Sequence, residues 1–323
     1  MKRLGILTSG GDAPGMNAAI RAAVRTATSL GMSMVGYVDG YSGFVAGDFR
    51  ELDDRSVGNV IQRGGTFIGT SRCEAFMDAA VRTAAVGQMR DTGVEGLVVI
   101  GGDGSFRGAL ALQREHAVPI TGIPGTIDND VLGTDETIGF DTAVNTAVLA
   151  IDQVRDTSES TGMMFFVEVM GHRSGAIAMH TAVAAGASGV LVPEEHESTD
   201  AFIARIKESI ARGKRSHIIV VAEGEEAGGA FAVAEQVGNE LGRPYRVVVL
   251  GHVQRGGRPS AQDRIIASQA GALAVTALAE GRQGVMIGRQ GGKPVEVPFE
   301  DAIKTVLPHG EYALLRLAQA ISG

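Results

Sequence analysis

The sequence lacks the cysteine pairs from which internal disulfides form, because Cys73 is the single cysteine in 323 residues. A chain without such crosslinks is typical of a reducing compartment, so we expect a cytoplasmic protein. Proline is also scarce, at 9 residues against 46 glycines, which suits tight turns between buried strands and helices. With 44% apolar residues the chain can fill the cores of two domains, and low-complexity disorder does not fit.

Long apolar runs and a basic surplus are missing as well. The apolar stretches are only about as long as buried strands, well short of the roughly 18 residues of a membrane span, and we expect neither a signal peptide nor a transmembrane helix. The formal net charge of -8 and the pI near 5.4 argue against a broad nucleic-acid or anionic-membrane surface. Local basic clusters remain compatible with this charge.

Short apolar runs alternate with longer helical patterns, which predicts βαβ units. The predicted strands are Leu4–Thr8, Met34–Val38, Leu97–Ile100, Ile120–Ile123, Phe165–Val169, Val190–Val192, Ile218–Ala222 and Val247–Leu250. Strands that are apolar throughout are expected in parallel sheets covered on both faces. We therefore predict a doubly wound α/β fold.

Two helices are predicted with defined ends. Residues Asn17–Leu30 carry alanines at helical spacing and stop at Gly31, so this helix can approach a sheet closely. Residues Thr199–Arg212 place isoleucines and a phenylalanine on one stripe, with a capping hydroxyl residue at the start and Gly213 at the end.

The first segment that indicates chemistry is Thr8–Asn17, with the sequence TSGGDAPGMN. Its glycines let backbone N–H groups face an anion at a helix start, although a plain tight turn is the alternative. The lysine of a P-loop is missing, and so is the Gly-x-Gly-x-x-Gly of a dinucleotide site. Asp39, after the second strand, is expected to be a turn residue rather than a ribose ligand.

Two further segments place acids after buried strands. Asp103, in Gly101–Ser105, is a candidate Mg²⁺ ligand beside room for a triphosphate, or simply an acid that compensates a helix dipole. Asp128 and Asp130, in Gly122–Asp130, can divide proton acceptance from metal or arginine binding, or can form a solvated turn.

Basic residues complete the pattern. Arg246, His252 and Arg255 lie among glycines and can clamp a sugar phosphate, whereas His252 alone would more often be structural. Arg72 follows a loop of small residues, Gly64–Ser71, which favours a role in charge stabilisation over a surface ion pair.

Over essentially its whole length the sequence resembles the ATP-dependent 6-phosphofructokinases of the bacterial type. Six segments in order carry the resemblance: Leu7–Asn17, Gly64–Thr66, Gly101–Ser105, Pro124–Asp130, Val167–Gly171 and Arg246–Arg264. It implies transfer of a phosphoryl group from Mg-ATP to the 1-hydroxyl of fructose 6-phosphate. It also implies a homotetramer, regulation by ADP or phosphoenolpyruvate, and no nucleic-acid or membrane partner.

The resemblance also implies residue roles. The catalytic set is Asp128 as the base, with Arg72, Thr126, Gly11 and Asp130. The set that binds ATP is Gly11, Arg72, Cys73, Gly102, Asp103, Gly104 and Ser105, and Asp103 would hold Mg²⁺. The set that binds the sugar phosphate is Thr126, Asp128, Met170, Gly171, His172, Glu223, Arg246, His252 and Arg255, with Arg246 coming from a neighbouring subunit. The effector set is Arg21, Arg25, Arg155, Arg212, Lys214 and Arg215, which would otherwise be solvated surface charges.

Some positions depart from the family pattern. Met163 stands where a second cross-subunit arginine is usual, so we predict that fructose 6-phosphate binds weakly, or without sensitivity to the neighbouring subunit, compared with typical members. His172 also stands where arginine is usual, although Arg173 follows directly. Asp54 and Ser188 depart in the effector set, which leaves the effector and its sign open. Relatives that use pyrophosphate carry an aspartate and a lysine where this sequence has Gly104 and Gly125, which favours ATP as the donor.

By the same resemblance the chain folds as two doubly wound, mostly parallel-sheet lobes. Residues 1–139 plus 253–304 would form the lobe that binds ATP, and residues 140–252 plus 305–323 the lobe that binds the sugar phosphate. Two rival functions stay open at this point. One is a catalytically silent sugar-phosphate or nucleotide sensor, and the other is a nicotinamide-dependent oxidoreductase.

Overall fold

A computed structural model describes residues 1–195, 198–224, 229–304 and 309–322. The chain divides into two compact units. Unit 1 comprises Met1–Thr126, Asp130–Thr142 and Arg255–Val306, and unit 2 comprises Ile127–Asn129, Ala143–Gln254 and Leu307–Gly323. The predicted crossing between lobes near Thr305 lies outside the described residues.

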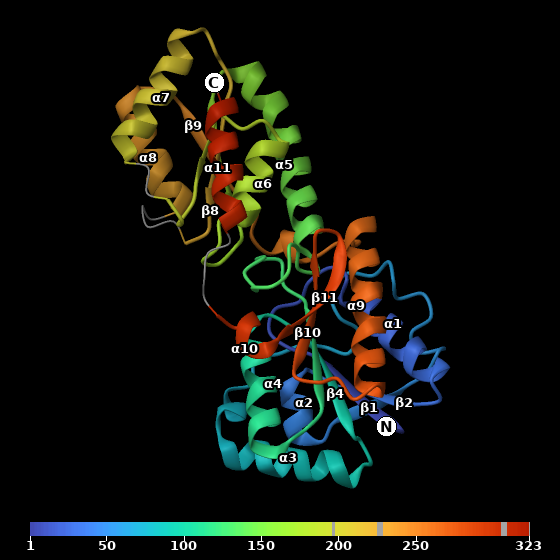
Figure 1. Ribbon diagram of the computed structural model, residues 1–323. Coiled ribbons are helices and arrows are strands. Elements are labelled where there is room, and N and C mark those ends of the chain that lie inside the picture. Colours follow the sequence, from blue (N-terminus) through green and yellow to red (C-terminus); the bar gives the residue numbers. More distant parts are fainter. Residues whose placement is uncertain (196–197, 225–228, 305–308, 323) are drawn as a thin grey trace. The chain divides into compact units, whose positions relative to one another are not determined.

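Unit 1 is built on a seven-stranded sheet with the order β11-β10-β5-β4-β1-β2-β3 (Figure 1). The strands are β1 (Arg3–Thr8), β2 (Ser33–Tyr37), β3 (Phe49–Leu52), β4 (Gly96–Gly101), β5 (Ile120–Pro124), β10 (Val285–Gln290) and β11 (Lys293–Pro298). Pairing is parallel except at the two edges, where β3 and β11 run antiparallel to their neighbours. The four predicted strands of this sheet, β1, β2, β4 and β5, are confirmed.

Helices cover the sheet of unit 1. They are α1 (Met16–Ser29), α2 (Tyr41–Ala46), η1 (Glu74–Met77), α3 (Ala79–Asp91), α4 (Asp103–His116), α9 (Ala261–Ala279) and α10 (Phe299–Ala302). Helix α1 packs along α9, and α2, α3, α4 and α10 form a second group around a buried aromatic cluster. A Cβ at Gly271 of α9 would lie 2.3 Å from the carbonyl oxygen of Ala19, so the backbones of α1 and α9 approach closely.

Unit 2 is built on a parallel four-stranded sheet with the order β7-β8-β6-β9. Its strands are β6 (Met164–Val169), β7 (Gly189–Leu191), β8 (His217–Ala222) and β9 (Tyr245–Val249), and all four were predicted. Its helical segments are α5 (Phe140–Thr161, whose first residues belong to unit 1), α6 (Ala176–Ala184), α7 (Thr199–Ala211), α8 (Gly229–Leu241), η2 (Gly251–Arg255) and α11 (His309–Ile321).

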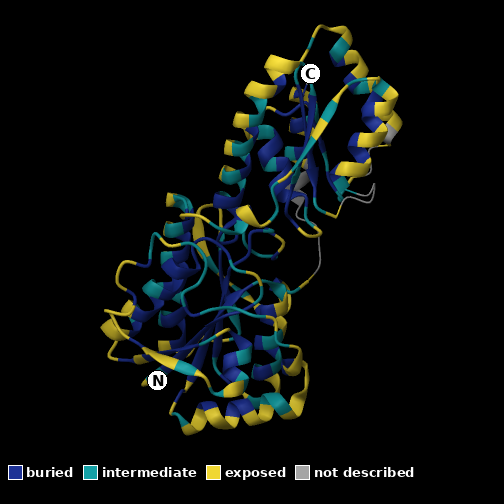
Figure 2. Cartoon of the chain, turned by 180° about the vertical axis from the view of Figure 1, so that it is seen from behind, coloured by how far each residue is buried: buried dark blue, intermediate teal, exposed yellow. Residues whose placement is uncertain are grey.

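The predicted stripe of α7 is the face that packs in unit 2. Phe202, Ile203 and Ile206 are buried with residues of α8, and the side chain of Ser198 accepts a hydrogen bond from the Ala201 amide at the helix start. In each unit the buried residues line the central strands and the inward helix faces (Figure 2). The predicted α/β fold class with parallel sheets is therefore confirmed. No helix within the described ranges is both long and apolar enough to cross a lipid bilayer.

Candidate active site

Three glycine-rich turns leave neighbouring strands at the same edge of the unit 1 sheet. Strand β1 pairs with β4, Thr8 opposite Ile100, and β4 pairs with β5, Gly101 opposite Pro124. The chain leaves β1 toward β2 on one side and reaches β4 on the other, so β1 and β4 flank a topological switch point. Open α/β sheets bind their ligands at the carboxyl ends of the strands at such a point.

The turn after β1 is fixed against the turn after β4. The Ser9 amide donates to the Ile100 carbonyl at 2.9 Å, and the Ser105 hydroxyl donates to the Ser9 carbonyl at 3.1 Å. Gly10 has a φ of 88° and Gly15, the N-cap of α1, a φ of 111°. These are left-handed conformations that favour glycine, so the backbone conformation of this turn requires glycine at positions 10 and 15. The two Gly-Gly-Asp segments that the sequence repeats are thus neighbours in space.

Arg255 lies directly over the first turn. A Cβ at Gly11 would be 2.1 Å from Nη1 of Arg255, and the same nitrogen donates to the Asp12 carbonyl at 3.3 Å. The guanidinium therefore occupies the space that any larger residue at position 11 would take. A guanidinium beside this glycine-rich turn is suited to bind a phosphate group.

The loop that leads to Arg72 is anchored by Asn17, in the first helical turn of α1. The Asn17 amide nitrogen donates to the carbonyls of Arg63 and Gly64, both at 3.1 Å, and its oxygen accepts from the Phe67 amide at 2.8 Å. One buried amide thus satisfies three backbone groups of a loop some 50 residues away, as buried polar groups require. The sequence pattern did not predict this role of Asn17.

Hydroxyl groups extend this attachment. Thr8 donates to the Gly69 carbonyl at 2.7 Å, and Thr70 donates to the Gly10 carbonyl at 2.9 Å. Arg72, two residues further on, is exposed, and Cys73 packs against the core next to it. The structure thereby ties the Arg72 loop to the same turn as Gly11.

The turn after β4 presents one carboxylate at the start of α4. Asp103 accepts from the Gly104 amide at 2.6 Å and from Nη2 of Arg107 at 3.0 Å, and about half of its side chain is exposed. Apart from its chain neighbours and the backbone of its own helix, no heavy atom of the described residues lies within 4 Å of a Cβ placed at Gly104, whereas one at Gly102 would be 3.8 Å from Thr126. The turn therefore has open space beside its acid.

This arrangement fits a magnesium ion that arrives with a nucleotide. Mg²⁺ is commonly held by one or two carboxylates together with substrate phosphates, rather than by an all-protein cage. The described residues contain no group of three or more His, Cys, Asp or Glu that would form such a cage. Asp103, exposed and beside Gly104, suits the first mode of binding.

The segment after β5 carries the predicted acid pair. Thr126 is buried and its carbonyl accepts from the Thr137 hydroxyl at 2.6 Å. Asp128 follows within residues 127–129, which group with unit 2, and is partly buried, while Asp130 is exposed. Asn129 between the two acids has a φ of 51°. The two carboxylates thus differ in solvation, as a division of roles between them requires.

Unit 2 gathers part of the predicted sugar-phosphate set at the carboxyl ends of β6 and β8. The Met170 amide donates to Oε1 of the buried Gln254 at 2.8 Å, and the His172 amide donates to Glu223 at 3.4 Å. Gly171 has a φ of 152°, and His172, at 55°, is in the left-handed region. Gln254 was not singled out from the sequence, and it fixes the backbone of this turn.

Arg246 lies away from that group within the chain. It pairs with Phe165 near the start of β6, five residues before Met170, which corresponds to about 16 Å along the strand. It is exposed on β9, an edge strand of the sheet. His252 is exposed on η2 after β9. One chain therefore does not bring Arg246 next to Met170.

Part of the predicted effector set forms a cationic cluster in unit 2. Arg155 donates to the carbonyl of Ala185, and Arg212 pairs with Glu208 at 3.2 Å. Burial lowers the pKa of Lys214, and the charges of Arg155 and Arg212 lower it further. Of the other three members, Arg21 and Arg25 are on α1 of unit 1, and Arg215 follows Lys214 directly and is exposed before β8.

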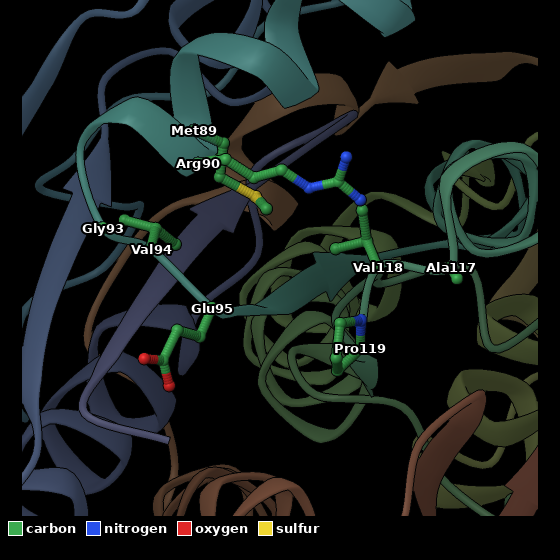
Figure 3. Close-up of a pocket in the computed structure, with 8 residues that line it drawn as sticks. All are labelled: Met89, Arg90, Gly93, Val94, Glu95, Ala117, Val118 and Pro119. Atoms are coloured by element: carbon green, nitrogen blue, oxygen red, sulfur yellow. The ribbon is translucent and has the colours of Figure 1, made fainter.

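A pocket of about 400 Å³ lies at the opposite edge of the unit 1 sheet, where β4 and β5 begin (Figure 3). Its apolar floor includes Met89, Val94 and Val118. Its charged groups already have partners, since Arg90 donates to a backbone carbonyl at 2.8 Å and Glu95 accepts from a backbone amide at 2.8 Å. It contains none of the predicted site residues, so we place the candidate active site at the glycine-rich turns.

Glycine-rich turns with one acid and one guanidinium, at the switch point of a parallel sheet, define a protein that binds phosphorylated ligands. The chain belongs to the phosphofructokinase family, whose model matches residues 3–278. It is 50% identical over 322 residues to the ATP-dependent 6-phosphofructokinase 1 of Thermus thermophilus, with 100% of both chains covered. It is 48% identical over 309 residues to the ATP-dependent 6-phosphofructokinase 2 of Bacteroides thetaiotaomicron, with 95% of both covered.

Solved structures agree with this fold. The phosphofructokinase from Saccharomyces cerevisiae matches with a TM-score of 0.88 and 32% identity over 100% of this chain, which spans 47% of the yeast chain. A pyrophosphate-dependent phosphofructokinase from Marinobacter aquaeolei matches with a TM-score of 0.85 over 98% of this chain and 91% of that one, and at 21% identity it shows the fold alone. The predicted family resemblance is confirmed.

Proposed function

We propose that this chain transfers the terminal phosphoryl group of Mg-ATP to the 1-hydroxyl of fructose 6-phosphate, which gives fructose 1,6-bisphosphate and ADP. The observation that carries the proposal is the Arg255 guanidinium, held over Gly11 at a switch point flanked by the turns that bear Asp103 and Thr126. The curated relatives at about half identity over the full chain are named ATP-dependent 6-phosphofructokinases, which favours a transferase over the sensor and oxidoreductase alternatives.

In this reaction a bond forms between the sugar oxygen and the γ-phosphorus while the bond from that phosphorus to the β-bridging oxygen breaks. The hydroxyl proton goes to Asp128, and ADP leaves with the electron pair of the broken bond. Arg72 and the Gly11 turn stabilise the group in transfer, and Thr126 and Asp130 orient the acceptor side. Asp103 would hold Mg²⁺, which would supply positive charge against the phosphate oxygens.

The remaining residues bind the two substrates. Those proposed to hold ATP are Cys73, Gly102, Gly104 and Ser105. Those proposed to hold fructose 6-phosphate are Met170, Gly171, His172, Glu223, Arg246, His252 and Arg255. In this proposal residues 1–139 plus 253–304 serve ATP, and residues 140–252 plus 305–323 serve the sugar phosphate.

Arg246 supports a proposal of assembly. Because Arg246 lies far along the strand from Met170, it can bind the sugar phosphate held at Met170 only if it comes from another copy of the chain. Its exposure on the edge strand β9 leaves it accessible to such a copy. The position of Arg246 supports an assembly of copies, and we propose the homotetramer that the family resemblance implies. ADP or phosphoenolpyruvate is proposed to bind at the Arg155 and Lys214 cluster, and the protein to act in the cytoplasm.

The test is a coupled assay on fructose 6-phosphate with ATP or pyrophosphate as donor, each with and without ADP. We expect turnover with ATP and little with pyrophosphate, because Gly104 leaves space for the nucleotide side of the donor. Turnover with pyrophosphate alone would refute the choice of donor. No turnover with either donor would refute the proposed activity.

A further inference from the structure

A buried hydrogen-bond network connects the start of α5 with the start of α9, close in sequence to Arg255. None of its members is among the proposed substrate contacts. Asp263, in the first turn of α9, is fully buried. Its carboxylate accepts from the Gly139 amide at 2.7 Å, from the Thr142 amide at 2.9 Å and from the Thr142 hydroxyl at 2.5 Å. Gly139 and Thr142 flank the start of α5. One carboxylate thus satisfies N–H groups that begin another helix.

The network continues to the segment that carries Arg255. The Ser260 amide donates to the Thr142 hydroxyl at 2.9 Å, and the Ser260 hydroxyl accepts from the Asp263 amide at 3.1 Å. The Thr142 hydroxyl therefore accepts from Ser260 and donates to Asp263, so its proton direction is fixed by its neighbours. Ser260 ends the segment 255–260, which begins with the guanidinium over Gly11.

The segment is also held at its middle. A Cβ at Gly64 would lie 2.2 Å from the Gly257 carbonyl oxygen, so the backbones of the two loops touch directly. The segment 255–260 is therefore held at three points: the Arg255 guanidinium on the Asp12 carbonyl, the Gly257 backbone against Gly64, and Ser260 on Thr142. A shift of Ser260 has to be taken up by the few residues between it and Arg255.

Burying a carboxylate has a free-energy cost that a purely apolar contact would not have. Burial raises the pKa of Asp263 to about 6, while the bonds from Thr142 and Gly139 oppose that rise. Helix starts favour negative charge, and two of them, those of α5 and α9, meet at this side chain. A buried carboxylate that is costly and yet accepts three hydrogen bonds indicates that it fixes the position of the backbone groups that donate to it.

We infer that Asp263 and Thr142 are a positioning pair, which fixes the segment 255–260 and thereby sets the Arg255 guanidinium on the Gly11 turn. The inference rests on the proposed function, in which Arg255 contacts the sugar phosphate. Neither residue is among those proposed to contact the reactants, and both are buried. The pair acts on the acceptor side, because the turn after β4 is held separately through Ser9 and Ser105.

The experiment compares Thr142→Val, which keeps the volume and removes the hydroxyl, with Thr142→Ser, which keeps the hydroxyl. We expect Thr142→Val to raise the KM for fructose 6-phosphate about tenfold, with the KM for ATP within about twofold of the parent, because a misplaced binding group acts on its own ligand. Thr142→Ser is expected to restore the parent values. A change in active fraction alone, with both KM values unchanged, would show a merely structural role and overturn the inference.

Amide exchange measured by mass spectrometry gives a readout that does not need turnover. Peptides that contain residues 139–142 and 255–260 are expected to exchange faster in Thr142→Val than in the parent and in Thr142→Ser. Unchanged exchange in both peptides would overturn the network. If the parent itself transfers no phosphoryl group, the proposed function fails while the exchange comparison still decides whether Thr142 fixes the segment. Asp263→Asn is expected to show the same pattern as Thr142→Val, since its amide group faces donors.

Discussion

Replacing Gly11 by alanine is expected to displace the Arg255 guanidinium without disturbing the fold. The new Cβ would be 2.1 Å from Nη1, whereas ordinary contacts begin near 3.4 Å, so the nitrogen has to retreat by about 1.3 Å. Gly11 does not have a positive φ, so its backbone tolerates alanine. A misplacement of about 1 Å can cost 10²-fold in rate, so we expect kcat/KM for fructose 6-phosphate to fall about 100-fold, or about 2.7 kcal/mol.

The assay is steady-state kinetics with ATP as donor, together with thermal unfolding. Gly87→Ala is the matched control, because this exposed glycine of α3 also lacks a positive φ and no described heavy atom lies within 4 Å of its Cβ position. The control is expected to keep parental kinetics and to gain about 0.5–1 kcal/mol of stability from helix propensity.

A double-mutant cycle tests whether the effect of Gly11→Ala is caused by displacement of the Arg255 guanidinium. If the alanine acts by moving the guanidinium, Gly11→Ala combined with Arg255→Ala should be no worse than Arg255→Ala alone. A Gly11→Ala protein whose kcat/KM stays within twofold of the parent would refute the reasoning. Additive losses in the double variant would locate the damage elsewhere than in Arg255.

Three further predictions concern the base, the sugar phosphate and a buried histidine. Asp128→Asn is expected to lower kcat by 10²–10⁴-fold with unfolding unchanged, and parental turnover would reject Asp128 as the base. Met163→Arg is expected to lower the apparent KM for fructose 6-phosphate. An unchanged KM would contradict the hypothesis that Met163 replaces an arginine contact to the sugar phosphate. Burial, with Lys214 and Arg243 nearby, lowers the pKa of His217 from 6.5 to about 4. The unfolded chain therefore takes up a proton that the folded chain resists, and stability present above pH 6.5 is lost as the pH falls toward 4. Urea unfolding should show about 2–3 kcal/mol of this loss between pH 7.5 and 4.5, and His217→Leu should remove that part, whereas an equal loss in both proteins would contradict the assignment.

Most of the strands that the sequence predicted are largely buried, and the edge strand β9, which is partly exposed, is the clearest exception. Their apolar runs need no partner to be recognised, because a covered parallel strand leaves no polar alternation. The missed strands β3, β10 and β11 lie toward the sheet edges, where Phe49–Leu52 and Lys293–Pro298 include charged, exposed residues. Their sequence signal is weak because the sheet, rather than their own composition, makes them strands.

At the site, the turns were predictable because glycine and acid patterns are local. The expectation that Asp39 is a turn residue agrees with its φ of 54° and with its backbone bonds to the neighbouring loop. What the sequence could not show are contacts across long separations, such as Arg255 over Gly11 and the amide of Asn17 under the loop before Arg72. Such contacts depend on which loops the topology brings together, and residue types alone do not reveal which loops become neighbours.

The approach of Gly64 to the Gly257 carbonyl has a consequence for redesign. Because main chain meets main chain there, the spacing of the two loops is insensitive to ordinary side-chain exchange, and any Cβ at position 64 would force them apart. Engineering of this protein toward other phosphoryl donors or acceptors should therefore keep Gly64 and Gly257 and vary the side chains of the two loops around this contact.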